Sequence, residues 1–498
     1  MKAIVVGSGP AGISAAKGLL ERGCEVILLD AGNTLEQDKK TLLHQVQQTD
    51  CLMNINRYRH HANGKKNLKL PYGSNFIYDG VKDYFSWSTK RCYFQPSFAR
   101  GGLSNVWGGA IAQYTENELS NWPARCRDLS TFYVEMISSL GHYYTADTET
   151  VLSKQACYLK HHWEKEHHLL KQNGFLFSTP TLAIDFKHCR FCASCQYGCP
   201  YELIYKSEIN LILLKTHENF KYVTDVIVEN FYETEQQIEL IVNNKKTKQV
   251  QKIFAERLFI ACGAGLSSLL YLRSLNKPNK ELRLQDSQHF LLPCVINQRI
   301  KDVSNEPMHT LCQLNLSLTQ QAISSYPIYL QLYTYMDLYL HEMKKKFKFL
   351  YPLVKPLSKS WLERLVVMQG YMDSRESNHL IIQYQKSGHF IINKSYTTAM
   401  KSTLNNIVQH LYRFRSHLAI KPLRFLTSLS LTGQSNHVGG SLPMSDNPKE
   451  DEVDIWGRPN HFRRIHFVDG SILPSIPAGP ITLTIMANAY RIAKEGPL

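Results

Sequence analysis

The chain lacks several features that would place it in a broad class at once. No apolar run reaches the roughly 18 uninterrupted residues of a membrane-spanning helix, since the tyrosine-rich stretch 326–340 is broken by Gln331 and Asp337. There is no long biased tract, no internal repeat, and no zinc finger, RNA-recognition signature or basic zipper. The apolar run 3–6 leads into a glycine loop instead of a small-residue cleavage site, so no secretory leader is expected. These absences predict a globular, cytoplasmic protein.

Acidic residues are scarce relative to basic ones. The 498 residues include 57 Lys and Arg against 42 Asp and Glu, which gives a formal charge of +15. Such a balance suits an acidic partner, but the basic residues are scattered and no nucleic-acid motif organises them. We therefore interpret the charge as a solvated basic surface and expect no nucleic-acid partner. The length exceeds that of one compact core and predicts two joined domains.

The first thirty residues follow the order strand, glycine loop, helix, strand. An apolar stretch at 2–6 precedes the loop, a helix-favouring stretch at 13–22 follows it, and a second strand at 25–29 ends at Asp30. The loop contains the spaced glycines Gly7, Gly9 and Gly12. In this context they allow a tight turn, the approach of a pyrophosphate to the backbone, and close helix packing, while Asp30 can bind a ribose hydroxyl. A turn that merely needs positive φ is the alternative. The surrounding elements favour a dinucleotide site, without distinguishing FAD from NAD.

A second glycine-dense loop spans 101–109 and predicts another cofactor contact. Three segments near the end of the chain complete a recognisable pattern: 436–440, 468–474 and 480–493. Together with the first thirty residues, these motifs resemble the glucose-methanol-choline (GMC) oxidoreductase family. The resemblance covers both ends of the chain well and the middle poorly.

The resemblance implies an α/β fold in which a discontinuous, Rossmann-like FAD-binding domain carries an inserted α+β substrate-binding domain. The FAD-binding domain would comprise 1–40, 95–125, 205–295 and 430–498. The substrate-binding or cap domain would comprise 126–204 and 296–429.

The resemblance also implies FAD as the cofactor, held by residues at matching positions. These are Gly7, Gly9, Gly12, Asp30, Gly101, Gly102, Ser104, Asp469 and Gly470. The first loop and Asp30 match the pyrophosphate and ribose positions. The second loop matches the one near the flavin, and Asp469 with Gly470 matches the segment beside the ribityl chain.

His437 is the candidate catalytic base. Oxidation of an alcohol by a flavin moves a hydride from carbon while a base takes the hydroxyl proton, and an imidazole with an ordinary pKa of about 6.5 is suited to that task. The sequence Asn-His-Val-Gly-Gly at 436–440 resembles the family's catalytic-histidine motif. A histidine that only stabilises its loop is the alternative interpretation.

One departure from the family pattern concerns the second catalytic position. The family usually has His or Asn ahead of the C-terminal helix, where this chain has Gly479 and Pro480. Either His437 and a group from the substrate domain hold the substrate hydroxyl, or catalysis is weakened or lost. Thr482 and Asn488 are candidate substitutes, although Asn488 lies two helical turns in and is expected to point elsewhere.

A cysteine run at 189–199 is the second specific signal. Cys189, Cys192, Cys195 and Cys199, followed by proline, have ferredoxin-type spacing and predict an iron-sulfur site. A four-cysteine 4Fe-4S cluster and a three-cysteine 3Fe-4S cluster on Cys189, Cys195 and Cys199 are both compatible with it. Zinc, with His188 joining a pair, and inert thiols are the alternatives.

The segment 344–364 combines seven basic residues and one acid with aromatic and apolar residues. It could contact an anionic membrane surface at the inner face of the membrane, or it could be a solvated cap over the active site. Sequence alone favours the cap.

The motifs together predict an FAD-dependent dehydrogenase that oxidises a CH-OH group of a sugar, a glycan intermediate or another alcohol. Electrons would leave through the iron-sulfur cluster to an external acceptor. An oxygen-using alcohol oxidase of the same family is one alternative. A low-activity flavin-binding scaffold at a membrane surface is the other.

Overall fold

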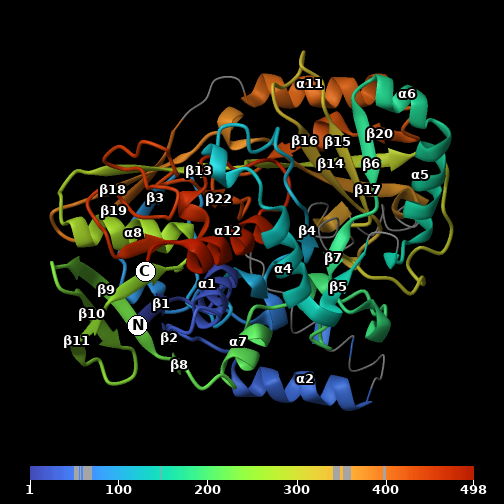
Figure 1. Cartoon of the computed structure of the whole chain (residues 1–498). Helices are drawn as coiled ribbons and strands as arrows, with labels where there is room; N and C mark the ends of the chain where they lie inside the picture. The colour runs from blue at the N-terminus through green and yellow to red at the C-terminus, as the bar shows by residue number, and fades with distance from the viewer. Residues whose placement is uncertain are drawn as a thin grey trace.

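The computed structural model describes residues 1–49, 55, 58–59, 70–146, 149–339, 348–350, 360–395 and 400–498. Two layered units make up the described part of the chain. In Figure 1 the chain termini lie close together in one unit, and in the other unit α11 lies above the strands and α5 and α6 lie to their right. No helix in these ranges is long and apolar enough to cross a membrane.

The first unit is built on a five-stranded parallel sheet with the strand order β23-β12-β1-β2-β8. Its strands are β1 (Lys2–Val6), β2 (Glu25–Leu29), β8 (Phe220–Val223), β12 (Arg257–Ile260) and β23 (Ile465–Phe467). A parallel sheet is covered on both faces, and the nearly continuous apolar strands β1 and β12 meet that requirement. The strands predicted at 2–6 and 25–29 are confirmed.

Helix α1 (Pro10–Leu20) follows the first glycine loop and packs against the C-terminal helix α12 (Thr482–Glu495). It begins earlier than the predicted 13–22, because Pro10 is favoured at the first helical position. Gly12 is required here, since a Cβ at this position would lie 1.8 Å from the Gly7 carbonyl oxygen. The close packing of helix on strand inferred from the motif is therefore present. Around this layer lie α2 (Gln37–Thr49), α4 (Ser130–Leu140), α7 (Glu208–Leu214) and α8 (Ala264–Leu275).

The second unit is built on an antiparallel sheet with the strand order β20-β14-β17-β16-β15-β6 and β21 paired to β14. The central strands are β14 (His289–Ile296), β15 (Leu314–Leu318), β16 (Ile328–Tyr333) and β17 (Leu365–Tyr371). The outer strands are β6 (Phe175–Ser178), β20 (Ile420–Pro422) and β21 (Ser428–Leu429). One face packs in a second core with residues of α5 (Lys154–Lys165), α6 (His167–Gln172) and α11 (Met400–Arg413). The helix-and-strand composition predicted for the middle of the chain is confirmed.

A third sheet has the order β22-β13-β18-β19-β3, and its buried residues pack in the core of the first unit. Its strands are β3 (Trp87–Lys90), β13 (Glu281–Asp286), β18 (Leu380–Tyr384), β19 (Phe390–Lys394) and β22 (Val438–Gly439). The smaller sheets contain β9 (Val226–Glu233), β10 (Ile238–Asn244) and β11 (Val250–Ala255), and β4 (Ala110–Ile111), β5 (Tyr144–Thr145) and β7 (Thr181–Ala183). Because β18 pairs with β13, hydrogen bonds cross the predicted domain boundary. The boundaries themselves stay a prediction.

Candidate active site

A cavity of about 580 Å³ is lined by residues of both units. The first unit contributes both glycine loops, the β2 end, the loop after β12 and the start of α12. The second contributes side chains of β14, β16 and β17. Most of the predicted site residues meet here: Gly7, Gly9, Asp30, Gly102, Ser104, His437, Asp469 and Gly470. Gly12 and Gly101 are absent from the lining.

The two glycine loops face each other across a short gap. A Cβ on Gly102 would lie 3.4 Å from the Gly9 Cα, and the Gly101 N–H donates to Ser8 Oγ at 2.9 Å. Ser104 Oγ donates to the Gly101 carbonyl at 2.6 Å, which stabilises the turn of the second loop. By contrast, a Cβ on Gly9 would meet no atom within 4 Å. The space beside Gly9 is therefore open toward the cavity.

Asp30 is a buried carboxylate that already holds hydrogen bonds. The hydroxyls of Ser8 and Tyr222 donate to it, the latter at 3.0 Å. Burial raises the pKa of Asp30 to about 6, opposed by these hydrogen bonds and by Arg100. The side chain is thus fixed at the end of β2, where the motif predicted a ribose contact.

Asp469 is likewise held by groups of the protein. Its carboxylate accepts from the Gly263 N–H at 2.8 Å, Ser267 Oγ at 2.5 Å and the Ser471 N–H at 2.9 Å. Burial raises the pKa of Asp469. The residue joins the loop after β12 to the segment after β23, so it shapes the cavity wall at Gly470.

These features fit a dinucleotide. The N-cap of α1 is Gly9 and carries no side-chain hydrogen bond, which leaves the first N–H groups of the helix for an anion. The described residues of the cavity wall include no Lys or Arg, so a pyrophosphate here would depend on backbone N–H groups. Gly9 and Gly102, at the contact between the two loops, leave room for a pyrophosphate.

The loop that carries His437 is anchored by Asp286, a buried residue that sequence reasoning missed. Asp286 accepts from the Gly433 N–H at 2.6 Å and from the Ser435 hydroxyl. Ser435 Oγ in turn accepts from the His437 N–H at 2.9 Å, and Ser287 N–H donates to the His437 carbonyl at 3.0 Å. Burial raises the pKa of the Asp286 carboxyl to about 7. No sequence motif marks this aspartate, because its role depends on the β13 and β22 pairing.

The imidazole of His437 lies against aromatic rings. Its centroid is 4.6 Å from that of Tyr371 with an interplanar angle of 16°, and Tyr371 is stacked with His289 at 5.8 Å. Burial, with a smaller effect of His289, lowers the pKa of His437 to about 4. Nδ1 is buried without a partner among the described residues. The ring is therefore neutral at neutral pH, and burial makes it a weaker base than the ordinary imidazole expected from the sequence.

Gly479 and Pro480 stand where the resemblance implies a second catalytic His or Asn, so this place offers no imidazole or amide. A Cβ on Gly479 would lie 3.2 Å from Tyr114 Cε1, and the Tyr114 hydroxyl donates to the Gly479 carbonyl at 3.0 Å. Pro480 and Thr482 line the cavity. Asn488 accepts from the Arg491 guanidinium at 2.9 Å and is buried elsewhere, as expected.

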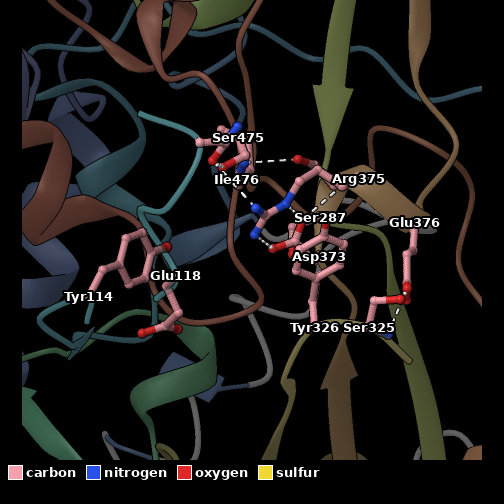
Figure 2. Close-up of polar contacts among 12 residues, drawn as sticks. Tyr114, Glu118, Ser287, Ser325, Tyr326, Asp373, Arg375, Glu376, Ser475 and Ile476 are labelled. Atoms are coloured by element: carbon pink, nitrogen blue, oxygen red, sulfur yellow. Dashed lines mark hydrogen bonds and ion pairs between the residues drawn. The ribbon is translucent and has the colours of Figure 1, made fainter. Parts of the chain in front are cut away.

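An ion pair between Asp373 and Arg375 stabilises the segment that follows Tyr371 (Figure 2). Arg375 Nη2 lies 2.7 Å from Asp373 Oδ2, and its guanidinium carbon lies 3.7 Å from the Tyr326 ring centroid. The next residue, Glu376, accepts from the Ser325 N–H at 2.8 Å. These contacts join the end of β17 to the loop before β16.

The cysteine run lies beside the cavity, since Gln196 is part of the cavity wall. Three of its sulfurs accept backbone N–H groups: Cys189 from Phe191, Cys195 from Thr310 and Cys199 from Leu203, at 3.4 to 3.5 Å. However, the described residues contain no group of three or more His, Cys, Asp or Glu side chains arranged to hold a metal ion. As the side chains stand, Cys189, Cys192, Cys195 and Cys199 do not fit a cluster, and His188 bonds to Asp185 at 2.6 Å. The iron-sulfur site stays a prediction.

Most of the basic segment 344–364 lies outside the described residues. Of its described part, Phe349 is 95% exposed and Trp361 is 44% exposed. Glu363 is buried and paired with Arg299. Neither the cap nor the membrane interpretation is tested by these contacts.

Comparison with known proteins adds a family and a fold. Residues 408–489 match the family model for GMC oxidoreductases. This match includes His437, Asp469 and most of α12, and so confirms the resemblance over the C-terminal part of the chain. No curated protein matches the sequence.

The fold is shared with a solved structure. The crystal structure of pyridoxine 4-oxidase from Mesorbium loti superposes with a TM-score of 0.61 and 13% sequence identity. The superposition covers 99% of this chain and 98% of that chain. The mixed α/β architecture is thus that of a known enzyme over its whole length.

Proposed function

We propose that the chain is an FAD-dependent oxidoreductase that oxidises the CH-OH group of an alcohol, with His437 as the base. The observation that carries the proposal is a single cavity that brings both glycine loops, Asp469 and His437 together. The family match over 408–489 and the shared fold support it.

The residues that would hold FAD follow from the cavity wall. Gly7, Gly9 and the N-terminus of α1 would bind the pyrophosphate, and Asp30 the ribose. The second glycine loop and the 469–470 segment would hold the rest of FAD. Gly12 and Gly101 do not line the cavity and would allow the turns of the two loops. Bound FAD supplies the acceptor for the hydride that leaves the substrate carbon.

The protein's own residues perform the proton chemistry. His437 is neutral because burial disfavours its charged form, and it takes the proton from the substrate hydroxyl. Asp286 and Tyr371 position its loop and its ring. Because Pro480 stands where the family usually has His or Asn, His437 is the one imidazole among the described residues of the cavity wall.

The route by which electrons leave the flavin distinguishes a dehydrogenase from an oxidase. A cluster on Cys189, Cys192, Cys195 and Cys199 would carry them to an external acceptor and favour a dehydrogenase. Among the described residues, these thiols do not form a ligand set for a metal ion. Transfer to oxygen would make the protein an oxidase, and a chain that binds flavin without turnover would be a scaffold.

A cytoplasmic location, the proposed domain boundaries and a membrane contact through 344–364 remain part of the hypothesis. They do not bear on the chemistry at His437.

The test compares H437A with H461A, since His461 is an exposed histidine away from the cavity. Both proteins are purified anaerobically, and bound FAD, iron and acid-labile sulfide are assayed. Each is then mixed with a panel of sugars and ring alcohols while the flavin absorbance is followed. We expect equal FAD in both, and flavin reduction slower by about 10²- to 10⁴-fold in H437A alone.

Each outcome separates one candidate. A protein that cannot bind FAD contradicts the proposal, and flavin that no alcohol reduces favours the scaffold. Stoichiometric peroxide without iron or sulfide identifies an oxidase, whereas near-stoichiometric iron and sulfide support the dehydrogenase. Equal rates in H437A and H461A would exclude His437 as the base.

A further inference from the structure

Acidic residues are absent from one long stretch of this chain. No Asp or Glu occurs between positions 377 and 445, which hold seven Lys and Arg, whereas the rest of the chain holds all 42 acidic residues. Helix α11, strand β20 and the single turn η11 (Arg424–Leu426) belong to this stretch. In Figure 1 α11 lies above the strands of the second unit, on its outer side. This part of the surface is therefore a candidate contact for an anionic partner.

Helix α11 has an apolar face and a polar face. Its buried residues pack in the core of the second unit, against the sheet. Asn405, Gln409 and Arg413 are exposed, and residues four positions apart lie on one line along a helix. A stripe of amide and guanidinium groups therefore faces away from the core.

Two more arginines meet at the end of this helix. The guanidinium carbon of Arg415 lies 4.7 Å from the Tyr412 ring centroid, and that of Arg424 lies 4.3 Å from it. Both arginines are exposed, and neither forms an ion pair with any residue that the structure describes. Glu166, which reaches this segment from the junction of α5 and α6, is itself paired with His417 at 2.8 Å. Two positive charges are thus held close together, and an anionic partner would supply their counter-ion.

A hollow of about 240 Å³ lies between α11 and the segment that follows β20. Its wall consists of Asn405, Val408, Gln409, Arg424 and Thr427. The guanidinium, amide and hydroxyl groups of this wall can donate hydrogen bonds to phosphate oxygens, and the arginine adds its charge. Among the described residues of the wall there is no carboxylate. The hollow therefore suits an anionic headgroup.

An aromatic side chain projects beside the hollow. Phe425 is the middle residue of η11, next to Arg424, and is 79% exposed. An exposed aromatic ring among basic residues combines the two contacts of an interfacial membrane site, apolar insertion and attraction to anionic headgroups. Single-stranded nucleic acid instead needs several free aromatic faces along a basic groove. The Tyr412 ring is covered by two arginines, so this surface favours a membrane.

These exposed groups form one surface, which we call the α11 surface: Asn405, Gln409, Arg413, Arg415, Arg424 and Phe425.

We propose that the α11 surface docks the protein on an anionic phospholipid bilayer, with Phe425 inserted among the headgroups and the three arginines against lipid phosphates. It includes no residue of the segment 344–364 and no residue of the cavity wall at His437. The docking does not depend on the proposed reaction, so either can fail without the other.

The first test measures co-sedimentation of the full-length protein with extruded vesicles. We expect the protein to bind phosphatidylcholine vesicles that contain about 30% phosphatidylserine at low salt, and not vesicles of phosphatidylcholine alone. The binding should be lost at about 1 M salt, where the screening length falls to about 3 Å.

The contribution of the arginines is measured with a charge-matched pair of variants. R415A/R424A should bind the anionic vesicles about tenfold or more weakly than the parent protein, since each arginine near the lipid surface adds to the attraction. R125A/R463A removes the same charge from exposed positions of the first unit and should bind nearly as the parent does. Thermal melting checks that both variants are folded.

The contribution of the aromatic ring is measured in two ways. F425S should bind the anionic vesicles about fivefold or more weakly, because the apolar insertion is lost, whereas F254S, at a 44% exposed position on β11, should bind as the parent does. F425W keeps an aromatic ring and reports its surroundings. After subtraction of the parent spectrum, its emission should shift to the blue and resist iodide quenching when anionic vesicles are added, whereas that of F254W should not.

The outcomes are distinct from those of the proposed reaction. Equal vesicle affinities of R415A/R424A and R125A/R463A, or an unshifted F425W spectrum on bound vesicles, would overturn the α11 surface as the docking site. Tighter binding to poly-glutamate or to single-stranded DNA than to the vesicles would also overturn it. Vesicle binding that requires both Phe425 and the two arginines would support it, whether or not an alcohol reduces the flavin.

Discussion

Replacing Asp286 with Asn removes a buried carboxyl group from beneath the loop that carries His437. Burial raises the pKa of Asp286 to about 7, compared with about 3.9 in an unfolded chain. Between these values the folded state binds more protons than the unfolded state, so the free energy of unfolding falls as pH rises. A shift of about 3 units corresponds to on the order of 4 kcal/mol, fully present below pH 4 and lost as pH passes through 7.

Asn cannot ionise, so D286N lacks this pH-dependent contribution. Its carbonyl can still accept one hydrogen bond from Gly433 or Ser435, and we expect it to be within about 1 kcal/mol of the parent at pH 5. By pH 8 it should gain on the parent by a few kcal/mol. D286A leaves both donors unsatisfied and should be less stable at every pH, by about 2 to 4 kcal/mol.

Urea unfolding followed by tryptophan fluorescence at pH 5, 6, 7 and 8 measures these differences. D446N is the control, because Asp446 is exposed and does not contact the loop. Parallel pH profiles for D286N and the parent protein would show that Asp286 is ionised throughout and would refute the argument. In that case the two hydrogen bonds, and not burial, would dominate its ionisation.

Three further predictions follow from the site and its supports. G9A should fold as the parent does but lose most of its bound FAD, since a Cβ there meets no protein atom and points into open space. G12A should fail to fold stably, because its Cβ would lie 1.8 Å from the Gly7 carbonyl oxygen. Thermal melts and released-flavin assays distinguish the two variants. R375L should lower the free energy of unfolding by about 3 to 5 kcal/mol, because it leaves the buried Asp373 carboxylate without its ion-pair partner. R125L, at an exposed position, should change the free energy of unfolding little. Equal stabilities of R375L and R125L would contradict a stabilising ion pair. The rate of flavin reduction should fall as pH drops through about 4, where His437 becomes protonated and can no longer accept a proton, and a profile that instead falls near pH 6.5 would show that burial does not act on this ring.

The sequence by itself determined the local structure at the beginning and end of the first unit. Strand, glycine loop, helix and strand follow one another locally, so the spacing of Gly7, Gly9 and Gly12 and the position of Asp30 specify them without long-range information. The histidine motif and the 468–474 segment could be recognised for the same reason. Their residues are contiguous, and each motif contains its own turn.

Tertiary structure decided what surrounds His437. Three separate segments of the chain contribute to this part of the structure: Asp286 with His289, then Gln331, then Gln369 with Tyr371. The pairing of β14, β16 and β17 brings all of them except Asp286 together. Alternation along these strands could have indicated one polar face, but not that the face lines the cavity. The cysteine run shows that spacing alone is not sufficient. Its spacing predicts a metal site, but in the part of the chain that the structure describes its side chains do not form one. Spacing constrains the backbone of a short segment, whereas a ligand set or a substrate pocket depends on how distant segments pack.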